Sequence, residues 1–481
     1  MGLLQILALS LIAFLLGQIP RQQWFAGAVL IASLLAIYWL QPSTPIRNLD
    51  FWLPTASILL TVIVWVSAQS AVSAERRHTL ASLAAVASVI MLLSLTRYMG
   101  LLCCLTASRP PSILPVAIAL LLMAGLLTLM WIFPNASRLF SRIVLWVVLG
   151  IFILLKTPSL AQSASAFLRS WSGQAVELAS PSDLSWLGFS YLAFRLIHVL
   201  RDDQAGKFQS RSLVSFINYA LFFPAYVSGP IDRWQRWNSD LQNRVALVRS
   251  NPESRFALTA TGFQRILIGS FKKFALADSL ALLSLNSQNA EQVVSTVWLW
   301  VLLFGYAWRI YFDFSGYTDI AIGLGNLMGF RLPENFDHPY LKTNLTAFWN
   351  SWHMTLAQWF RAYLFNPLTR TLRMRPEKLP PWLIILIGQT ITMTLIGLWH
   401  GVAWNFLIWG LWHGVGLFVH NRWADWMRAR SAFIEARPTL AGLIKISGWA
   451  LTFLFVALGW VWFALPDLPL AWQVFQKLAG H

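Results

Sequence analysis

The chain has 481 residues, of which 57% are hydrophobic and only 11% are charged. A soluble domain carries about 25% charged residues, so this composition excludes an ordinary water-soluble protein. The chain has a net charge of +17, and in a membrane protein such an excess of Arg and Lys usually lies in cytoplasmic loops. The charge therefore does not require nucleic acid as a partner. The two cysteines, Cys103 and Cys104, are adjacent in an apolar run, so we expect small buried side chains and neither a disulfide nor a nucleophilic thiolate.

Six apolar runs follow one another in the first part of the chain, and each approaches the roughly 20 residues that a helix needs to cross a bilayer. The first run lacks a basic n-region and a small-residue cleavage site, so we expect a retained span. None of the six contains a cluster of ionisable residues, so residues 1–157 are interpreted as a transmembrane scaffold. The runs lie near residues 3–18, 24–40, 52–68, 80–105, 112–133 and 143–156.

A polar, serine-rich stretch at residues 158–185 is interpreted as a linker, and the apolar segments after it are interrupted by Pro, Gly, Asp, Asn and His. Such interruptions are tolerated at membrane depth only where protein or a water-filled cavity satisfies the backbone, so several segments are expected to be re-entrant. The sequence therefore predicts an all-α, polytopic membrane protein with about 11 to 13 spans. The later segments lie near residues 186–200, 212–229, 257–276, 293–312, 316–330, 345–368, 382–399, 402–420 and 443–464.

The block from Tyr311 to Leu368 places ionisable residues among aromatic residues and glycines, beside apolar helices. An ionisable group in such a segment marks a functional site by default. The alternative is a set of interhelical hydrogen bonds that pin re-entrant loops, and this structural interpretation is favoured for three of the residues, Asp313, Asp319 and Glu334. The full set is Asp313, Asp319, Glu334, Asp337, His338 and His353.

A second block, from Thr394 to Phe418, contains two histidines that are each followed by glycine in a Trp-rich apolar run. Burial lowers the pKa of histidine, so that its neutral ring can accept a proton as a general base. His400 is the candidate for this role, although a histidine on an apolar helix is often a satisfied core residue. For the other histidines the structural interpretation stands: His413 hydrogen-bonds across helices, His198 lies inside a helix, and His338 lies in the NFDHPY turn.

Several motifs in order resemble the membrane-bound O-acyltransferase family, in the bacterial branch of alginate O-acetylation and teichoic acid D-alanyl transfer proteins. They span Gly188 to Gly416 and include GFSYLAFRLIHVLRD, LFFPAYVSGPIDR, GFQRILIGSFKKFALAD, YFDFSGYTDIAIG, FWNSWH, GLWHG and WGLWHG. The resemblance implies helices around a central tunnel and a catalytic core at residues 186–420, followed by a loop and a last span at 421–481. The turn TRTLRMRPEK departs from the branch, and no motif corresponds before Leu184.

The resemblance implies that His353 and His400 are the catalytic histidines. We expect His400 to take the proton of the attacking hydroxyl, while His353 positions the acyl donor or stabilises the oxyanion. Trp352 and Asn350, beside His353, are predicted to bind substrate, as is Asp313.

The same resemblance implies which molecules the protein works with. The donor would be acetyl-CoA or another acyl thioester, including an acyl-carrier protein, and the acceptor an extracytoplasmic polysaccharide or a partner transferase. No metal is expected, because the second half lacks cysteine and no two histidines share a ligand-like spacing with a carboxylate. No permanently bound cofactor and no nucleic acid partner are expected either. Two basic clusters are expected to be cytoplasmic and to face anionic headgroups, or alternatively the phosphates of acyl-CoA. They are Arg233, Arg236, Arg244, Arg249 and Arg255, and Arg361, Arg370, Arg373, Arg375 and Lys378.

Two other functions stay open. The acceptor could be a lipid or a protein, with the fold unchanged. A secondary transporter or flippase is the other class, but its internal repeat is missing, because the first half contains no copy of DFSGYTD or GLWHG. The predicted location is the cell membrane.

Overall fold

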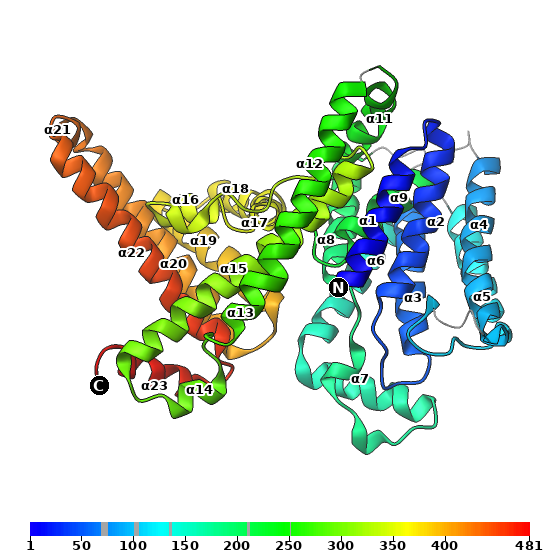
Figure 1. Ribbon diagram of the computed structural model, residues 1–481, viewed down its shortest axis with the longest axis horizontal. Helices are drawn as coiled ribbons and strands as arrows, with labels where there is room; N and C mark the ends of the chain where they lie inside the picture. Colours follow the sequence, from blue (N-terminus) through cyan, green and yellow to red (C-terminus); the bar gives the residue numbers. More distant parts are fainter. Residues whose placement is uncertain (69–75, 101–104, 134–136, 209–211, 251) are drawn as a thin grey trace. The chain divides into compact units, whose positions relative to one another are not determined.

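The computed structural model describes residues 1–481 apart from 69–75, 101–104, 134–136, 209–211 and 251. The described residues form helices and no strand (Figure 1), which confirms the predicted all-α class. Cys103 and Cys104 lie outside the described residues. The chain forms two compact units: unit 1 comprises residues 1–266 and 320–332, and unit 2 comprises residues 267–319 and 333–481.

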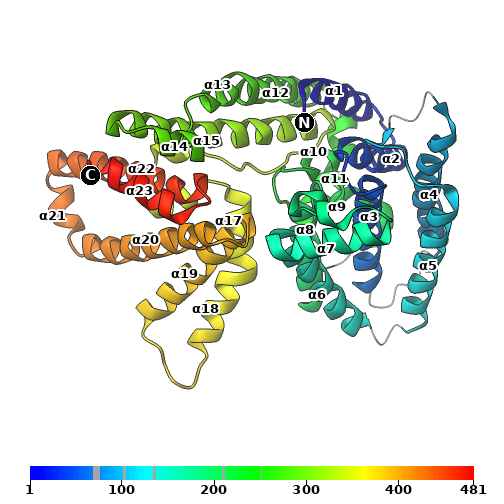
Figure 2. The same ribbon diagram turned by 90° about the horizontal axis from the view of Figure 1, so that it is seen from below.

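Unit 1 begins with six helices that follow the predicted apolar runs. The largest difference is in α4, which ends at Leu95 where the apolar run was predicted to continue to residue 105. Figures 1 and 2 both show α4 and α5 side by side. The six helices are α1 (Leu3–Gly17), α2 (Gln22–Leu40), α3 (Leu49–Ser67), α4 (Arg76–Leu95), α5 (Ile113–Ile132) and α6 (Ser137–Lys156).

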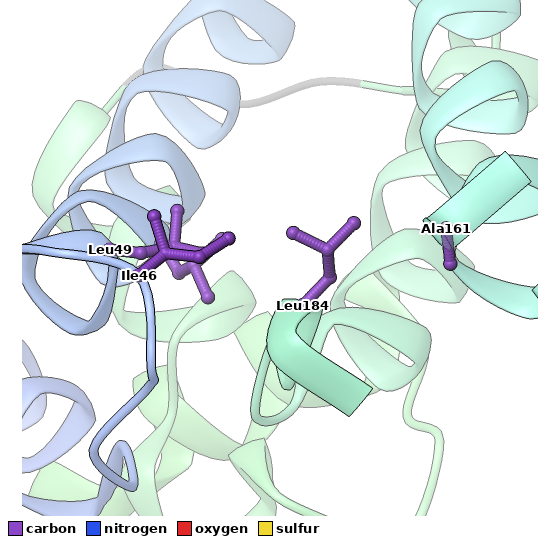
Figure 3. Packing of buried hydrophobic residues seen from close by; sticks show 5 residues of the cluster. Ile46, Leu49, Ala161 and Leu184 are labelled. Atoms are coloured by element: carbon purple, nitrogen blue, oxygen red, sulfur yellow. The ribbon is translucent and has the colours of Figure 1, made fainter. Parts of the chain in front are cut away.

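The segment predicted as a polar linker is folded. It forms α7 (Pro158–Trp171) and two short 3-10 turns, η4 (Val176–Leu178) and η5 (Pro181–Leu184). Ala161 and Leu184 pack with Ile46 and Leu49 at the start of α3 (Figure 3). The serine-rich composition hid the apolar positions of α7, which recur at helical spacing and face this small core.

The rest of unit 1 is shorter and more polar. The apolar segment predicted at residues 212–229 is divided into two helices around Leu221, so it does not form one span. The elements are the 3-10 turn η1 (Thr96–Tyr98), α8 (Phe189–Gln204), α9 (Leu213–Ala220), α10 (Phe223–Tyr226), α11 (Trp234–Ser250) and α12 (Pro252–Ser270), whose last turn belongs to unit 2.

In unit 2, the long helix α15 (Thr296–Leu327) is continuous for 32 residues where two separate segments were predicted. Its last eight residues, 320–327, belong to unit 1. The helix continues through Gly316, and a Cβ at this position would lie 2.7 Å from the carbonyl oxygen of Gly269. The glycine is therefore required by close helix packing, as is common between membrane helices.

The segment predicted at residues 345–368 is broken into α16 (Leu345–Trp349), α17 (Met354–Phe360) and the π-helical turn η8 (Arg361–Phe365). The turn between α16 and α17 carries His353. The other elements of unit 2 are the π-helical turn η6 (Phe271–Ala277), α13 (Asp278–Ala281), α14 (Ser287–Gln292), η7 (Pro339–Leu341), α18 (Asn366–Arg373), α19 (Pro381–His400), α20 (Trp404–Arg428), α21 (Ser431–Glu435), α22 (Pro438–Ala464) and α23 (Leu468–Leu478).

Seven helices in the described part of the chain are long and apolar enough to cross a membrane. They lie in α2 to α6, α19 and α22, so the chain is a multi-pass membrane protein. Seven is fewer than the 11 to 13 spans predicted, because several apolar segments are broken, α1 is short, and other helices carry more polar residues. The predicted central tunnel stays a prediction.

Glycines bring α19 and α20 together as an antiparallel pair. A Cβ on Gly410 would lie 2.6 Å from the Met393 carbonyl oxygen, and a Cβ on Gly414 would lie 2.8 Å from the Thr390 Cα. A Cβ on Gly397 would collide with the carbonyl oxygen of Phe406. This close approach fixes His400, the last residue of α19, against the first turns of α20.

Candidate active site

His353 lies at the N-cap of α17, in the left-handed backbone region with φ 42° and ψ 52°. Its side chain is buried, with 3% of the residue exposed. The backbone around it is held by two hydrogen bonds: the Met354 N–H donates to the Asn335 carbonyl at 2.9 Å, and the Asp337 N–H donates to the Ser351 carbonyl at 3.0 Å. The turn that presents His353 is therefore clamped by the segment around Asn335.

The side chain of Asn335 fixes the tautomer of His353. Asn335 Oδ1 accepts from the Thr355 backbone N–H at 3.3 Å and from Thr355 Oγ1 at 2.6 Å. Since a backbone N–H can only donate, the Asn335 atom at this position must be the oxygen. His353 Nδ1 lies 3.3 Å from the same oxygen and must therefore carry the hydrogen.

The other ring nitrogen, His353 Nε2, is consequently the basic one. It is buried and has no hydrogen-bond partner among the residues that the structure describes. Burial lowers the pKa of His353 to about 3, so the ring is neutral near pH 7. His353 lies outside the seven candidate spans, in the turn before α17. The arrangement is that of a neutral imidazole that can accept a hydrogen bond or a proton.

His400 and His353 contact the same indole. The ring centroids of His400 and Trp399 are 4.4 Å apart, and those of His353 and Trp399 are 6.0 Å apart. His400 also lies edge-on to Phe463, at a centroid distance of 4.7 Å. The two predicted catalytic histidines are therefore both held in one aromatic neighbourhood of unit 2, although their catalytic roles stay predictions.

Of the predicted substrate-binding residues, Trp352 is an internal part of unit 2. It is buried, with 5% exposed, and its ring lies 5.2 Å from the rings of both Phe336 and Trp460. Asn350 is exposed, and its Oδ1 accepts from Arg361 Nη2 at 2.7 Å. Both residues flank the His353 turn, and their binding roles stay predictions.

The two aspartates of the DFSGYTD motif form ion pairs with consecutive lysines of η6. Asp319 is buried and pairs with Lys272 at 2.7 Å, and the more exposed Asp313 pairs with Lys273. These contacts agree with the structural interpretation favoured for both aspartates, and they join η6 to α15. The role of Asp313 in substrate binding stays a prediction. The sequence analysis missed the two lysine partners, because nothing in the sequence marks them as neighbours of aspartates that lie 40 and 47 positions away.

The prediction that His413 forms a hydrogen bond across helices is wrong. Its ring is fully buried, and neither ring nitrogen has a hydrogen-bond partner among the described residues. Instead, aromatic rings enclose the imidazole, with Trp409 at 4.9 Å and Trp349 at 5.2 Å between centroids. Aromatic packing replaces the polar partner that the sequence interpretation assumed.

The remaining histidines have structural surroundings. His198 is buried in α8, and its Nε2 accepts from the Trp234 backbone N–H at 3.2 Å. His338 is exposed, and its Nδ1 lies 3.1 Å from Asp337 Oδ1. No group of three His, Cys, Asp or Glu residues that could hold a metal ion occurs within the described part of the chain.

The first basic cluster is partly internal, which the sequence interpretation did not foresee. Arg244 is buried and donates to the carbonyl oxygens of Met328 at 2.8 Å, Gly17 at 3.1 Å and Ile19 at 3.1 Å. Arg236 pairs with Asp232 and Asp240. The members of the second cluster are exposed: Arg361, Arg370, Arg373, Arg375 and Lys378.

Comparison with known proteins assigns a family to this arrangement. A probable alginate O-acetylase of Pseudomonas aeruginosa is 33% identical over 293 residues, which are 61% of this chain and 51% of that protein. A teichoic acid D-alanyltransferase of Streptococcus thermophilus is 33% identical over 245 residues, 50% of this chain and 58% of that protein. A peptidoglycan O-acetyltransferase of Helicobacter pylori is 32% identical over 272 residues, 56% of this chain and 48% of that protein.

The chain thus spans about half the length of the curated relatives it matches. The family model of the membrane-bound O-acyltransferases matches residues 139–454, which include His353 and His400. Since this match covers more than half of the chain, the protein belongs to the membrane-bound O-acyltransferase family.

Proposed function

We propose that this protein is an O-acyltransferase of the cell membrane that moves an acetyl or other short acyl group from a cytoplasmic thioester to an acceptor outside the cytoplasm. The acceptor is a hydroxyl group of a polysaccharide, or a partner transferase that completes the modification. The observation that carries the proposal is the buried, neutral His353 beside the same tryptophan as His400, with an Nε2 that has no hydrogen-bond partner among the described residues. The names of the relatives support it, because alginate, teichoic acid and peptidoglycan are all extracytoplasmic polymers.

The two histidines take different parts in the proposed reaction. His400 accepts the proton of the acceptor hydroxyl as its oxygen attacks the thioester carbonyl, and the proton then passes to the departing thiolate. An oxyanion needs a hydrogen-bond donor, whereas His353 offers a lone pair at Nε2, because its hydrogen is held at Nδ1 by Asn335. Nε2 of His353 can instead accept a hydrogen bond from an N–H or O–H group of the acyl donor. Of the two roles predicted for His353, positioning the acyl donor is therefore the one that the hydrogen-bond network supports.

The donor in this proposal is acetyl-CoA, another acyl-CoA, or an acyl-carrier protein, and it is a substrate and not a bound cofactor. The exposed basic cluster of unit 2 supports a phosphate-bearing donor, because it offers guanidinium groups that pair with phosphate in a bidentate way. In particular, Arg370 and Arg373 lie on the exposed face of α18, whose Leu372 is buried.

The test is acylation of the cell-surface polymer by His400→Ala and His353→Ala variants, with the amount of each variant in the membrane measured in parallel. We expect His400→Ala to reduce acylation by about 100- to 10,000-fold at an unchanged protein level, the range of general base catalysis. The matched control is His338→Ala, because His338 is an exposed histidine of the same unit. Unchanged acylation in the His400→Ala variant would exclude the proposed role, and loss of the protein itself would favour a structural one.

A further inference from the structure

Two cavities at one end of unit 1 form a recess lined by three arginines. One has a volume of about 670 Å³ and is lined in part by Trp39, Arg97, Ser108 and Arg109. The other, of about 320 Å³, shares Arg97, Ser108 and Arg109 and adds Arg47. We call Arg47, Arg97 and Arg109, with Trp39 and Ser108, the arginine recess. All of it precedes residue 139, where the family match begins, so the family assigns no role to it.

Hydrogen bonds hold the described parts of both loops of the recess. The Arg47 backbone N–H donates to Gln174 Oε1 at 2.9 Å, and Gln174 Nε2 donates to the Pro45 carbonyl at 3.0 Å. The loop that carries Arg47 is thereby anchored to the folded segment after α7. On the same loop, Ile46 is buried in the small core shown in Figure 3.

The part of the second loop around Ser108 and Pro110 is held in a similar way. Arg97 Nη1 donates to the Pro110 carbonyl at 2.6 Å, and Ser108 Oγ donates to Asp50 Oδ1 at 2.8 Å, which ties this part to α3. These described residues are therefore largely in position before a ligand arrives, which reduces the entropy lost on binding.

The recess carries an excess of positive charge. Three guanidinium groups line it, and Asp50, which contacts Ser108, is buried with 2% exposed. Arg47 and Arg109 are exposed and can turn toward a ligand. Guanidinium groups bind carboxylates in a bidentate way, and the half-buried Trp39 offers an aromatic face for the C–H groups of a sugar ring. This combination suits an acidic sugar better than a lipid phosphate, which would need the guanidinium groups but would make no use of an aromatic face.

The distribution of basic residues places the recess outside the cytoplasm. Consecutive spans run in opposite directions, so the α2–α3 and α4–α5 loops of the recess lie at one end of unit 1, and the α1–α2 turn lies at the other. The α11 helix and the start of α12 belong to that other end, because Arg244 of α11 and Arg255 of α12 both donate to the Gly17 carbonyl at 3.1 Å. Figure 1 likewise shows α7 and α11 at opposite ends of unit 1.

Basic residues at the α11 end outnumber those at the recess end, and short loops rich in Arg and Lys stay in the cytoplasm. The recess therefore faces the extracytoplasmic side. The α11 end has Arg21, Arg138, Arg142, Arg201, Lys207, Arg233, Arg236, Arg244 and Arg255, and the recess end has Arg47, Arg97, Arg109, Lys156 and Arg169.

We propose that the arginine recess binds a carboxylate-bearing sugar of an extracytoplasmic polymer and so recruits an acidic acceptor to this protein. The recruiting role rests on the proposed acyl transfer, but the binding itself does not. The sugar carboxylate pairs with the guanidinium groups, Ser108 and Asn48 are placed to contact sugar hydroxyls, and Trp39 packs against the ring.

Binding is tested with the full chain in phosphatidylcholine nanodiscs, using a short oligouronate as the probe and a neutral oligoglucan of equal length as its control. We expect the oligouronate to bind the wild type in a salt-sensitive way, and an Arg47→Gln/Arg109→Gln variant to bind it at least about tenfold more weakly. Arg21→Gln is the matched control, because Arg21 is an exposed arginine at the other end of the unit. A His400→Ala variant should bind as the wild type does, which separates a failure of binding from a failure of catalysis.

Equal binding by wild type and the double variant, or equal binding of the neutral oligomer, would overturn the proposal. The proposal would also be overturned if the wild type bound phosphatidylglycerol in preference to phosphatidylcholine but did not bind the oligouronate.

The side of the membrane on which the recess lies is tested in a Cys103→Ser/Cys104→Ser background. Ser43→Cys, in the α2–α3 loop, should react with an impermeant maleimide in intact cells, and Gln23→Cys only after permeabilisation; the reverse pattern would refute the placement.

Discussion

Replacing Asn335 with alanine should disable His353 while leaving its imidazole in place. Asn335 Oδ1 is the shared acceptor for His353 Nδ1, the Thr355 backbone N–H and Thr355 Oγ1. Without this oxygen, the ring is free to hold its hydrogen on Nε2, where the proposed role requires a lone pair.

The structure sets the size of the effect. A neutral buried hydrogen bond contributes about 1 kcal/mol, so the loss of three should lower the free energy of unfolding by roughly 3 kcal/mol. A reactant that is misplaced by about 1 Å can lose roughly 100-fold in rate. Because His353 positions the acyl donor in the proposed reaction, we expect kcat/KM for the donor to fall by about 100-fold in Asn335→Ala.

Asn335→Asp is the informative companion variant, since it keeps an acceptor oxygen but adds a negative charge 3.3 Å from His353 Nδ1. In the wild type, burial holds the pKa of His353 at about 3, so this residue causes no loss of activity between about pH 5 and pH 8. A carboxylate favours the imidazolium and raises that pKa. The acid limb of kcat/KM should therefore move to higher pH in Asn335→Asp, with activity lost as the pH falls.

The assay is acyl transfer by the purified full chain in nanodiscs, over a range of pH, with the melting temperature of each variant measured alongside. A wild-type kcat/KM in a folded Asn335→Ala variant would refute the link between Asn335 and His353. An Asn335→Asp profile that overlays the wild-type profile would refute the requirement for a neutral His353.

Two further predictions concern packing. His413→Phe should keep the melting temperature of the protein or raise it, because both ring nitrogens of His413 lack partners in the described part of the chain. A buried polar group without a partner costs about 1 to 3 kcal/mol. A marked loss of stability would show that the imidazole has a polar partner. Arg244→Met should lower the melting temperature far more than Arg370→Met does, since Arg244 holds three carbonyl oxygens and Arg370 is exposed. Equal melting temperatures for these two variants would contradict the structural role of Arg244.

The sequence predicted the first six helices well, because each of them is a continuous apolar run. The apolar run at residues 112–133, for example, became α5 (Ile113–Ile132). It failed where an apolar or polar average hid a local pattern. The serine-rich segment folds as α7 because Ala161 and its neighbours pack on a core whose other half comes from α3, more than 100 residues earlier.

The candidate site was predictable to the level of its histidines and no further. His353 and His400 stand out as ionisable residues in apolar, Trp-rich segments. Asn335 does not stand out, because its importance comes from a contact with a residue 18 positions away. In the same way, Arg244 looked like one more residue of a basic loop, and only its three carbonyl partners show that it is internal.

The backbone of His353 has a consequence for how stability and activity trade against each other. A left-handed conformation costs a residue with a side chain roughly 1 to 2 kcal/mol, and glycine adopts it almost freely. The backbone conformation alone would favour glycine at position 353, where φ is 42°, but glycine would also leave a cavity where the buried imidazole now packs. Because these two effects oppose each other, the melting temperature of a variant at this position says little about the role of the imidazole, and such variants should be selected by turnover as well as by melting temperature.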